Sequence, residues 1–387
     1  MRPRPALLTL FSSLAVAALA ATSAAAAVPR SSDEPSARSP QVVAATDSDG
    51  DALPDAWETN GYDANGDGVV DVDLPAMGAT PNKKDLFVEM DYMDGRLAST
   101  AALDRIVQVY ATAPVSNPDG STGIRVHLDA GSARGTKYDL GGGNQVPYDA
   151  DLNPSATQTN AIKAANFASV RKAVFYYMIW GDSYDGGCSS GQAFNIPNDT
   201  FIVTVGPKCS WNATDNYNVG TFVHEFGHNI GLKHGGTDNV NYKPNYLSVM
   251  NYFFQLGGVL KSDGSLYWGY SNVAPPALNE AGLKESAGLG SSAAAFKTMW
   301  KCPNGSNRTT SGAASGPIDW NCDGDTADTA RADINDDNAR TSLTAQNNWA
   351  SLIFGGGAVG GGTTVQPKAG TGEIKDLTHD EWTAMQH

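Results

Sequence analysis

The sequence predicts an α/β (α+β) protein in which helices pack against a mixed, twisted β-sheet. Two observations support this fold class: apolar stretches with strand periodicity alternate with stretches of helical spacing, and their order is β-α-β-α-β-β-α. Strands separated by helices in this way are typical of a sheet that is covered by those helices.

The elements of this order begin at residue 85. The stretch 85–93 alternates apolar and acidic residues and predicts a strand. A helix is expected at 100–112, where Leu103, Ile106 and Tyr110 have helical spacing. The elements expected next are a strand at 123–128, an Ala-rich helix at 161–172, a buried strand at 173–180, a strand at 201–205 and a helix around residue 224. Beyond residue 252 the chain is rich in glycine, and short helices are expected at 276–283, 343–354 and 377–385.

The N-terminus has the features of an export signal. Arg2 and Arg4 precede an apolar run, and small residues at 24–27 end it, so residues 1–27 are predicted to be a secretory signal peptide. Residues 28–46 are polar and contain prolines, which favours a disordered or short pro-segment. Outside the signal, no stretch has the ~20 apolar residues of a membrane span. The mature protein is therefore expected to be secreted.

Cysteine content and charge agree with export. Four cysteines fit two disulfides, and their order favours Cys188–Cys209 and Cys302–Cys322, while the two other pairings remain open. The net charge of −15 disfavours nucleic acid as a partner. Asp is far more frequent than Glu, which favours acidic loops and hard-cation ligands over solvated helix surfaces.

The first acidic loop resembles a twelve-residue calcium loop. Oxygen ligands are expected at positions 1, 3, 5, 7, 9 and 12, which are Asp47, Asp49, Asp51, the Leu53 carbonyl, Asp55 and Glu58. Position 6 is Ala52 where such loops have glycine, so the match departs from a true EF-hand. The alternative is a solvated acidic loop, which would hold five carboxylates together without a counter-ion.

Two further acidic loops are weaker matches. The second offers Asp63, Asn65, Asp67 and Asp71, and it is incomplete unless Asp73 or the first loop contributes a ligand. The third offers Asp319, Asn321, Asp323 and Asp325, with further ligands expected from Asp333 or Asn335. For the third loop the alternative is a turn held by the disulfide through Cys322. One to three structural calcium ions are expected in total.

The most specific pattern is H-E-x-x-H-x-x-G-x-x-H, which runs from His224 to His234. In a helix His224 and His228 lie one turn apart on the same face, so both imidazoles can reach one zinc ion. Glu225 lies beside them and is expected to be the general base. Gly231 allows the helix to end and the chain to bend, which brings His234 to the third ligand position. Three His ligands leave one position open for water, which is typical of catalytic zinc. The alternatives are a core helix that contains histidines and a zinc site without turnover.

A second pattern lies downstream, in the segment Tyr246-Leu-Ser-Val-Met-Asn-Tyr252. Together the two patterns resemble the metzincin clan of zinc metallopeptidases. The resemblance implies that Met250 forms a hydrophobic floor beneath the zinc ligands. It also implies that Tyr252 can ligate zinc and stabilise the oxyanion, as in the astacin and serralysin branches. After His234 the chain continues with Gly235 and Gly236, which departs from the best-known branches and leaves the subfamily unassigned.

The resemblance also implies an organisation for the whole chain. A metzincin-like catalytic domain is expected over 85–362, with the sheet and helices in an upper lobe, an irregular lower lobe and zinc in the cleft between them. From the residues themselves, 47–84 are expected to form an acidic calcium-binding segment before this domain, and 363–387 a C-terminal tail.

The expected function is that of a secreted, calcium-stabilised zinc endopeptidase acting on a protein or peptide substrate. One catalytic zinc ion and Glu225 as general base supply the chemistry. Two alternatives remain: a non-catalytic, calcium-dependent extracellular binding protein that retains a zinc site, and an enzyme that hydrolyses a non-peptide amide. The sequence makes no prediction of oligomeric state.

Overall fold

A mixed β-sheet forms the centre of the structure, a computed structural model that describes residues 45–361 and 376–386. The predicted signal peptide and most of the 28–46 segment lie outside the described residues. The strands of the sheet are β1 (Asp85–Met93), β2 (Arg125–Asp129), β3 (Gln145–Val146), β4 (Phe175–Trp180), β5 (Gly191–Ala193) and β6 (Thr200–Val203). Their order is β2-β1-β4-β6-β5, with β3 paired to β1. All pairs are parallel except β5 with β6, so the prediction of a mixed sheet is confirmed and β5 is an edge strand.

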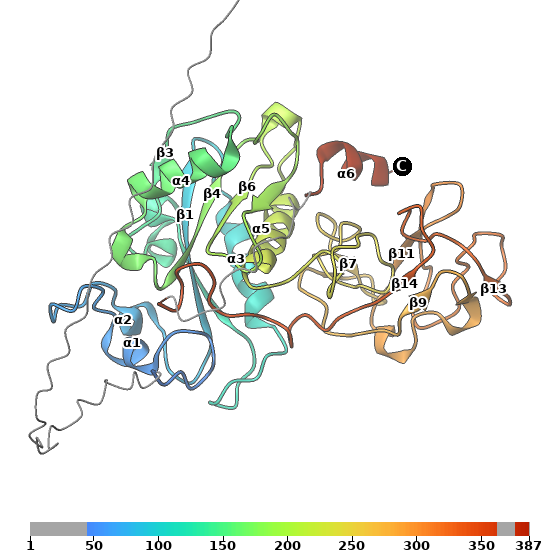
Figure 1. Ribbon diagram of the computed structural model, residues 1–387, viewed down its shortest axis with the longest axis horizontal. Coiled ribbons are helices and arrows are strands. Elements are labelled where there is room, and N and C mark those ends of the chain that lie inside the picture. The colour runs from blue at the N-terminus through green and yellow to red at the C-terminus, as the bar shows by residue number, and fades with distance from the viewer. Residues whose placement is uncertain (1–44, 362–375, 387) are drawn as a thin grey trace, which may run out of the picture. The chain divides into compact units, whose positions relative to one another are not determined.

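Helices cover both faces of this sheet (Figure 1). The helices of the described residues are α1 (Asp55–Asn60), α2 (Leu74–Met77), α3 (Thr100–Ala111), α4 (Ser155–Asn166), α5 (Asp215–Asn229) and α6 (His379–Met385). Apolar residues of α3 and α5 pack on one face, against Val88 and Met178 among others. Phe87 and Ile179 face the other side and pack with residues of α2 and the loops beside α1. The predicted combination of sheet and covering helices is therefore confirmed.

Strand β1 carries acidic side chains into the interior because each has a partner there. Asp85 accepts from Arg125 at 2.7 Å and lies 2.6 Å from His127, which identifies His127 as an ordinary strand residue. The Arg171 guanidinium lies 2.5 Å from Glu89, and the Tyr177 hydroxyl donates to Asp91 at 2.5 Å. These buried acids are compatible with a central strand because their charges are paired or hydrogen-bonded.

Two helix predictions are wrong, and one is displaced. Helix α4 runs from Ser155 to Asn166 and is displaced toward the N-terminus relative to the predicted 161–172 helix. Asp185 holds its start, since its carboxylate accepts from the N–H and the hydroxyl of Ser155. Neither 276–283 nor 343–354 is helical. The first segment contains β9 and the start of β10, which pair with β14 and β13, and in the second the N–H groups of Asn348 and Ile353 donate to the carbonyls of Ser271 and Ile230. Such long-range pairing outweighs local helix propensity. The last helix, predicted at 377–385, is α6.

The chain after α5 forms an irregular region of short antiparallel strand pairs. Its strands are β7 (Val259–Leu260), β8 (Leu266–Tyr267), β9 (Leu278–Asn279), β10 (Leu283–Lys284), β11 (Met299–Lys301), β12 (Asn307–Thr309), β13 (Thr329–Ala330) and β14 (Ser342–Leu343). They pair as β7–β8, β9–β14, β10–β13 and β11–β12. The described residues from Ala45 onward form one compact unit.

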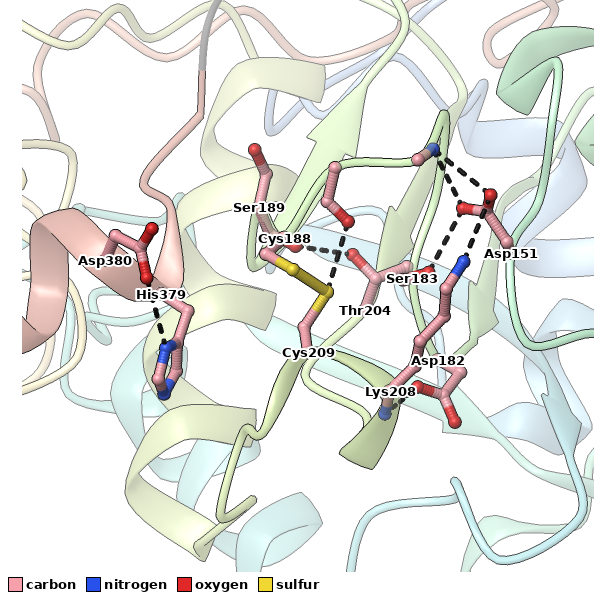
Figure 2. Close-up of a disulfide and its surroundings, with 12 residues drawn as sticks. Asp151, Asp182, Ser183, Cys188, Ser189, Thr204, Lys208, Cys209, His379 and Asp380 are labelled. Carbon is pink, nitrogen blue, oxygen red and sulfur yellow. Dashed lines mark hydrogen bonds and ion pairs between the residues drawn. A yellow bond between two sulfur atoms is a disulfide. The ribbon is translucent and has the colours of Figure 1, made fainter.

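All four cysteines form disulfides, in the pairing that their order favoured. The Cα atoms are 5.2 Å apart in Cys188–Cys209 and 5.8 Å apart in Cys302–Cys322. The Cys188–Cys209 bridge joins the loop before β5 to the loop after β6, next to Ser189 and Thr204 (Figure 2). Among the described helices, none combines the length and the apolar character needed to cross a membrane.

Candidate metal centre

Helix α5 places the first two predicted ligands in the interior. The helix begins at Asp215, after Thr214, whose side chain accepts from the N–H of Tyr217. Every residue from Asn218 to Asn229 is buried, so α5 is a central helix and not an amphipathic surface helix. Polar side chains on such a helix need partners inside the protein.

The three histidines converge on one point. The Nε2 atoms of His224 and His228 are 3.2 Å apart, and that of His234 lies 3.2 Å from the first and 3.1 Å from the second. Tetrahedral coordination with Zn–N distances of about 2.0–2.1 Å implies separations of about 3.3 Å between ligand nitrogens. The triangle of nitrogens therefore has the dimensions of three corners of a zinc site.

Hydrogen bonds on the far side of two imidazoles orient them toward this point. The Nδ1 atom of His224 donates to the carbonyl of Val249, and that of His228 donates to the carbonyl of Leu232, both at 2.8 Å. Because a carbonyl only accepts, the proton of each neutral ring is on Nδ1 and the Nε2 atom presents a lone pair. Two such lone pairs 3.2 Å apart repel each other unless a cation lies between them. Burial lowers the pKa of both His228 and His234 to about 3, so both rings are neutral, as metal ligation requires.

The end of α5 explains how His234 reaches the site. The N–H of Gly231 donates to the carbonyl of His228 and that of Leu232 donates to the carbonyl of Gly227, which is a Schellman ending. Gly231 has a φ of +92°, a conformation that glycine adopts without strain. The prediction that Gly231 ends the helix and turns the chain toward His234 is confirmed.

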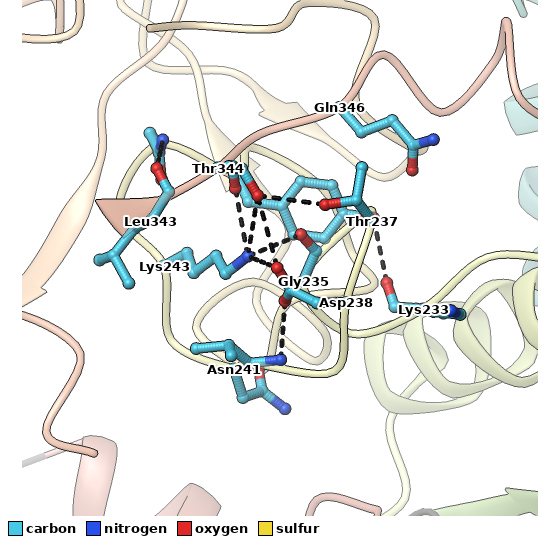
Figure 3. Close-up of polar contacts among 12 residues, drawn as sticks. Lys233, Gly235, Thr237, Asp238, Asn241, Lys243, Leu343, Thr344 and Gln346 are labelled. Atoms are coloured by element: carbon cyan, nitrogen blue, oxygen red, sulfur yellow. Dashed lines mark hydrogen bonds and ion pairs between the residues drawn. The ribbon is translucent and has the colours of Figure 1, made fainter. Parts of the chain in front are cut away.

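A buried lysine supports the loop that follows His234. The amino group of Lys243 donates to the carbonyl of Gly235 at 3.0 Å, to Asp238 at 2.6 Å and to the carbonyl of Thr344 at 3.2 Å (Figure 3). A Cβ atom at Gly235 would lie 2.2 Å from Asp238 Oδ1 and 2.9 Å from Lys243 Nζ. Glycine after the third histidine is therefore required by this packing. Lys243 was not predicted, and an isolated lysine in a loop carries no signal of such a role.

Met250 packs against helix α5 at Gly227, the residue before His228. A Cβ atom at Gly227 would lie 2.4 Å from Met250 Sδ, so the glycine inside the helix allows the sulfur to approach. Met250 is fully buried, and the neighbouring Val249 carbonyl binds His224. The role of Met250 as a hydrophobic floor beneath the ligands stays a prediction.

Tyr252 lies at the edge of the histidine cluster. Its ring centroid is 4.7 Å from that of His234 and 5.8 Å from that of His224. Its backbone N–H donates to the side chain of Asn241 at 2.9 Å, which holds the residue in position. Burial raises the pKa of Tyr252 well above its usual value, so the phenol is a hydrogen-bond donor at neutral pH.

Glu225 is buried between α5 and the edge strand β5. A Cβ atom at Gly191 would lie 2.7 Å from Glu225 Oε1, so the carboxylate lies against the first residue of β5. Neither carboxylate oxygen has a hydrogen-bond partner among the described residues. Burial, and then the charge of Asp376, raise the pKa of Glu225 well above its usual value. A carboxyl group of raised pKa beside a metal site is suited to take and return a proton.

The structure adds one acidic residue to this cluster. Asp376 is buried and has a carboxylate oxygen within 4.8 Å of a ring nitrogen of each of the three histidines. Its Oδ1 atom is 3.7 Å from His234 Nε2. Sequence reasoning missed Asp376, because it lies more than a hundred residues from the motif and has no pattern around it.

The first acidic loop forms a second cluster, together with a residue outside the loop. Carboxylate oxygens of Asp47, Asp49 and Asp51 lie within 4.8 Å of one another, and the same holds for Asp51, Glu58 and Asp85. The oxygens of Asp49 and Glu58 are buried without a hydrogen-bond partner in the described part of the chain. Burial raises the pKa of Asp49 to about 6, of Asp51 to about 8 and of Glu58 to about 9. Oxygens of this kind, close together and unpartnered, fit a hard cation such as calcium.

The remaining residues of this loop shape it. Asp55 accepts from the N–H and the hydroxyl of Ser48, both at 2.7 Å. It belongs to neither of the two carboxylate clusters of this loop. Leu53 is buried, and its N–H donates to Asp51. Ala52 has a φ of +74°, the conformation for which related loops use glycine. Asp85 was not predicted, although an acid at the start of a buried strand is a usable signal.

The second loop is an exposed turn. The Asp63 carboxylate accepts from the N–H groups of Gly66 and Gly68, and Asp71 accepts from that of Ala64. Asn65 and Asp67 likewise bind within the loop. Asp73, considered as an additional ligand, caps helix α2 instead. Among the described residues, those expected to bind calcium here form no cluster of three carboxylates like those of the first loop.

The third loop gains different partners from those expected. The carboxylates of Asp325, Glu285 and Asp328 form a cluster, with oxygens within 4.8 Å of one another. Asp319 accepts from the N–H groups of Asp323 and Gly324, and Asn321 also binds Asp323. Asp333, expected to return to this loop, instead accepts from Asp337 and Asn338 in a turn of its own, next to Asn335. Asp333 and Asn335 therefore do not return to this loop, and the carboxylates that lie near Asp325 are those of Asp328, three residues along the chain, and of Glu285, which is distant in sequence.

Comparison with protein family models, curated proteins and solved structures found no match to this chain. The interpretation of the site therefore depends on its own residues and geometry.

Proposed function

We propose that this chain is a secreted, calcium-stabilised zinc endopeptidase of the metzincin type. The observation that carries the proposal is the triangle of His224, His228 and His234 Nε2 atoms, 3.1–3.2 Å apart, with Glu225 on the same helix. The two disulfides are compatible with an exported protein.

The three histidines would hold the zinc ion through their Nε2 atoms. Bound zinc lowers the pKa of a coordinated water and polarises a substrate carbonyl. Glu225 takes a proton from the attacking water and returns it to the leaving amine, for which its raised pKa is suited. The Tyr252 hydroxyl donates a hydrogen bond to the developing oxyanion. Substrate backbone pairs with the edge strand β5, against which Glu225 lies.

A second candidate has an observation in its favour. Asp376 would complete a tetrahedron with the three histidines, and closed four-ligand sites are typical of structural zinc. This arrangement favours the non-catalytic alternative, an extracellular binding protein that retains zinc for stability. The two candidates differ in whether the protein turns over substrate once Asp376 is removed from the metal.

The test combines metal analysis with peptide cleavage. Purified mature protein and the Glu225→Ala variant should each contain about one zinc ion, because Glu225 is not a ligand. Only the protein with Glu225 should cleave a quenched peptide library. The absence of zinc from both proteins would refute the proposed site, and equal cleavage by both would refute the role of Glu225.

A further inference from the structure

The C-terminal segment 376–386 begins at the histidine cluster, where Asp376 lies 3.7 Å from His234 Nε2. Asp376 is 2% exposed, and neither of its carboxylate oxygens has a hydrogen-bond partner in the parts of the chain that are described. A buried carboxylate without donors needs a cation beside it. Among the described residues, the feature that could hold a cation next to Asp376 is the point where the three histidine nitrogens converge, within 4.8 Å of its carboxylate.

The backbone after Asp376 pairs with the residues just before β5, as an additional β-strand would. Thr378 forms an antiparallel bridge with Ser189, and the N–H of Ser190 donates to the carbonyl of Leu377 at 2.9 Å. The N–H of His379 donates to the carbonyl of Cys188, also at 2.9 Å. These partners immediately precede β5, the edge strand of the sheet. The segment therefore occupies backbone groups that an extended substrate would use.

Helix α6 anchors the segment beside the site. It begins with a capping box between Thr378 and Glu381. The indole N–H of Trp382 donates to the Tyr217 hydroxyl at 3.0 Å, which joins α6 to the start of α5. His379 lies close to the Cys188–Cys209 disulfide (Figure 2), and its ring packs edge-on against Trp211, with centroids 4.9 Å apart.

The site is buried in this conformation. His224, His228 and Glu225 are fully buried, and His234 is 3% exposed. Residues 376–378 therefore limit the access of a peptide bond to Glu225, and cleavage by the unaltered protein depends on the molecules in which they are displaced. The position opposite the three histidines is also the one that a catalytic water would need.

We propose that Asp376 is a fourth ligand of the zinc ion held by His224, His228 and His234, and that segment 376–386 thereby keeps the enzyme latent. This inference rests on the proposed peptidase function. Displacement of the segment opens the fourth coordination position and the edge of β5 together, because Asp376 and Thr378 belong to the same short stretch. The segment is thus an inhibitor built into the chain.

The test compares Asp376→Ala with the matched control Asp380→Ala. Asp380 lies in the same segment, but its side chain is fully exposed. Two readouts are needed: the rate at which a chelator removes zinc, and the rate of peptide cleavage. Loss of a ligand should accelerate zinc removal by about tenfold or more. Cleavage should rise at least about tenfold in Asp376→Ala, while Asp380→Ala should match the wild type in both. Trp382→Ala, which loosens α6 and leaves Asp376 intact, should raise cleavage in the same direction.

Three results would overturn the inference in different ways. Unchanged zinc removal in Asp376→Ala would show that Asp376 is not a ligand. Faster zinc removal with no cleavage would assign the zinc to structure, and would count against both latency and the proposed function. Equal cleavage by wild type and Asp376→Ala, abolished by Glu225→Ala, would refute latency and leave the peptidase proposal standing.

Discussion

Removal of calcium from the first acidic loop should destabilise the protein measurably. The relevant cluster consists of Asp47, Asp49, Asp51, Glu58 and Asp85, in which the oxygens of Asp49 and Glu58 are buried and unpartnered. A ligand that binds only the folded state at a hundred times its Kd stabilises it by about 2.7 kcal/mol. With an unfolding entropy of about 2.1 cal/mol/K per residue over roughly 330 described residues, that corresponds to a fall in Tm of about 4 °C.

The assay is thermal unfolding in calcium and in EGTA for three proteins. The Glu58→Gln variant removes a ligand charge, and Asp94→Asn removes an exposed carboxylate just beyond the end of β1. Wild type and Asp94→Asn should both lose about 4 °C in EGTA, whereas Glu58→Gln should lose much less. In EGTA, Glu58→Gln should be at least as stable as the wild type, because burial raises the pKa of Glu58 to about 9 and its charge is unfavourable there.

Two results of these melts would refute the assignment of a calcium ion to this cluster. If EGTA lowers the Tm of Glu58→Gln as much as that of the wild type, then Glu58 does not bind the cation. If EGTA changes the Tm of none of the three proteins, then the orphaned oxygens of Asp49 and Glu58 have another explanation.

Three further predictions concern pH, packing and the oxyanion. In EGTA the Tm should fall as the pH rises from 5 to 9. Burial raises the pKa values of Asp49, Asp51 and Glu58 to about 6, 8 and 9, so over this range the folded state holds protons that the unfolded chain has already lost. A Tm that stays constant or rises with pH would contradict this. Gly227→Ala should lower the free energy of unfolding by about 1–3 kcal/mol in denaturant titrations, because the new methyl lies 2.4 Å from Met250 Sδ; equal or greater stability would show that the sulfur moves aside at no cost. Tyr252→Phe should lower kcat about 100-fold with zinc content unchanged, and an unaltered kcat would exclude Tyr252 from the oxyanion.

Local pattern was sufficient for several features of the candidate site. His224 and His228 lie one turn apart in any α-helix, and Gly231 is suited to a left-handed ending, so their placement follows from backbone geometry alone. Sequence order also favoured the observed cysteine pairs, each of which closes a short loop. Periodicity identified β1, β2, β4 and β6, because their apolar residues form the two packed faces of the sheet, whereas the short strands β3 and β5 were not predicted.

Features that depend on distant contacts were not predicted. The helix expected at 276–283 is absent because β9 pairs with β14 and β10 pairs with β13. The helix expected at 343–354 is absent because backbone N–H groups of this segment donate to the distant carbonyls of Ser271 and Ile230. Asp85 joins the first acidic loop because β1 begins beside that loop, and its N–H donates to Asp51 at 2.6 Å. No local pattern records either contact.

The sequence by itself determined which histidines meet at the candidate zinc centre and that a helix carries the first two, because the spacing of residues along a helix fixes the distance between their side chains. Only the tertiary structure decided what closes that centre. Asp376 meets the histidines because the C-terminal segment pairs beside β5 and α6 packs against Tyr217 and Trp211. Contacts of this kind depend on how far-separated surfaces fit together, and one isolated aspartate carries no trace of them.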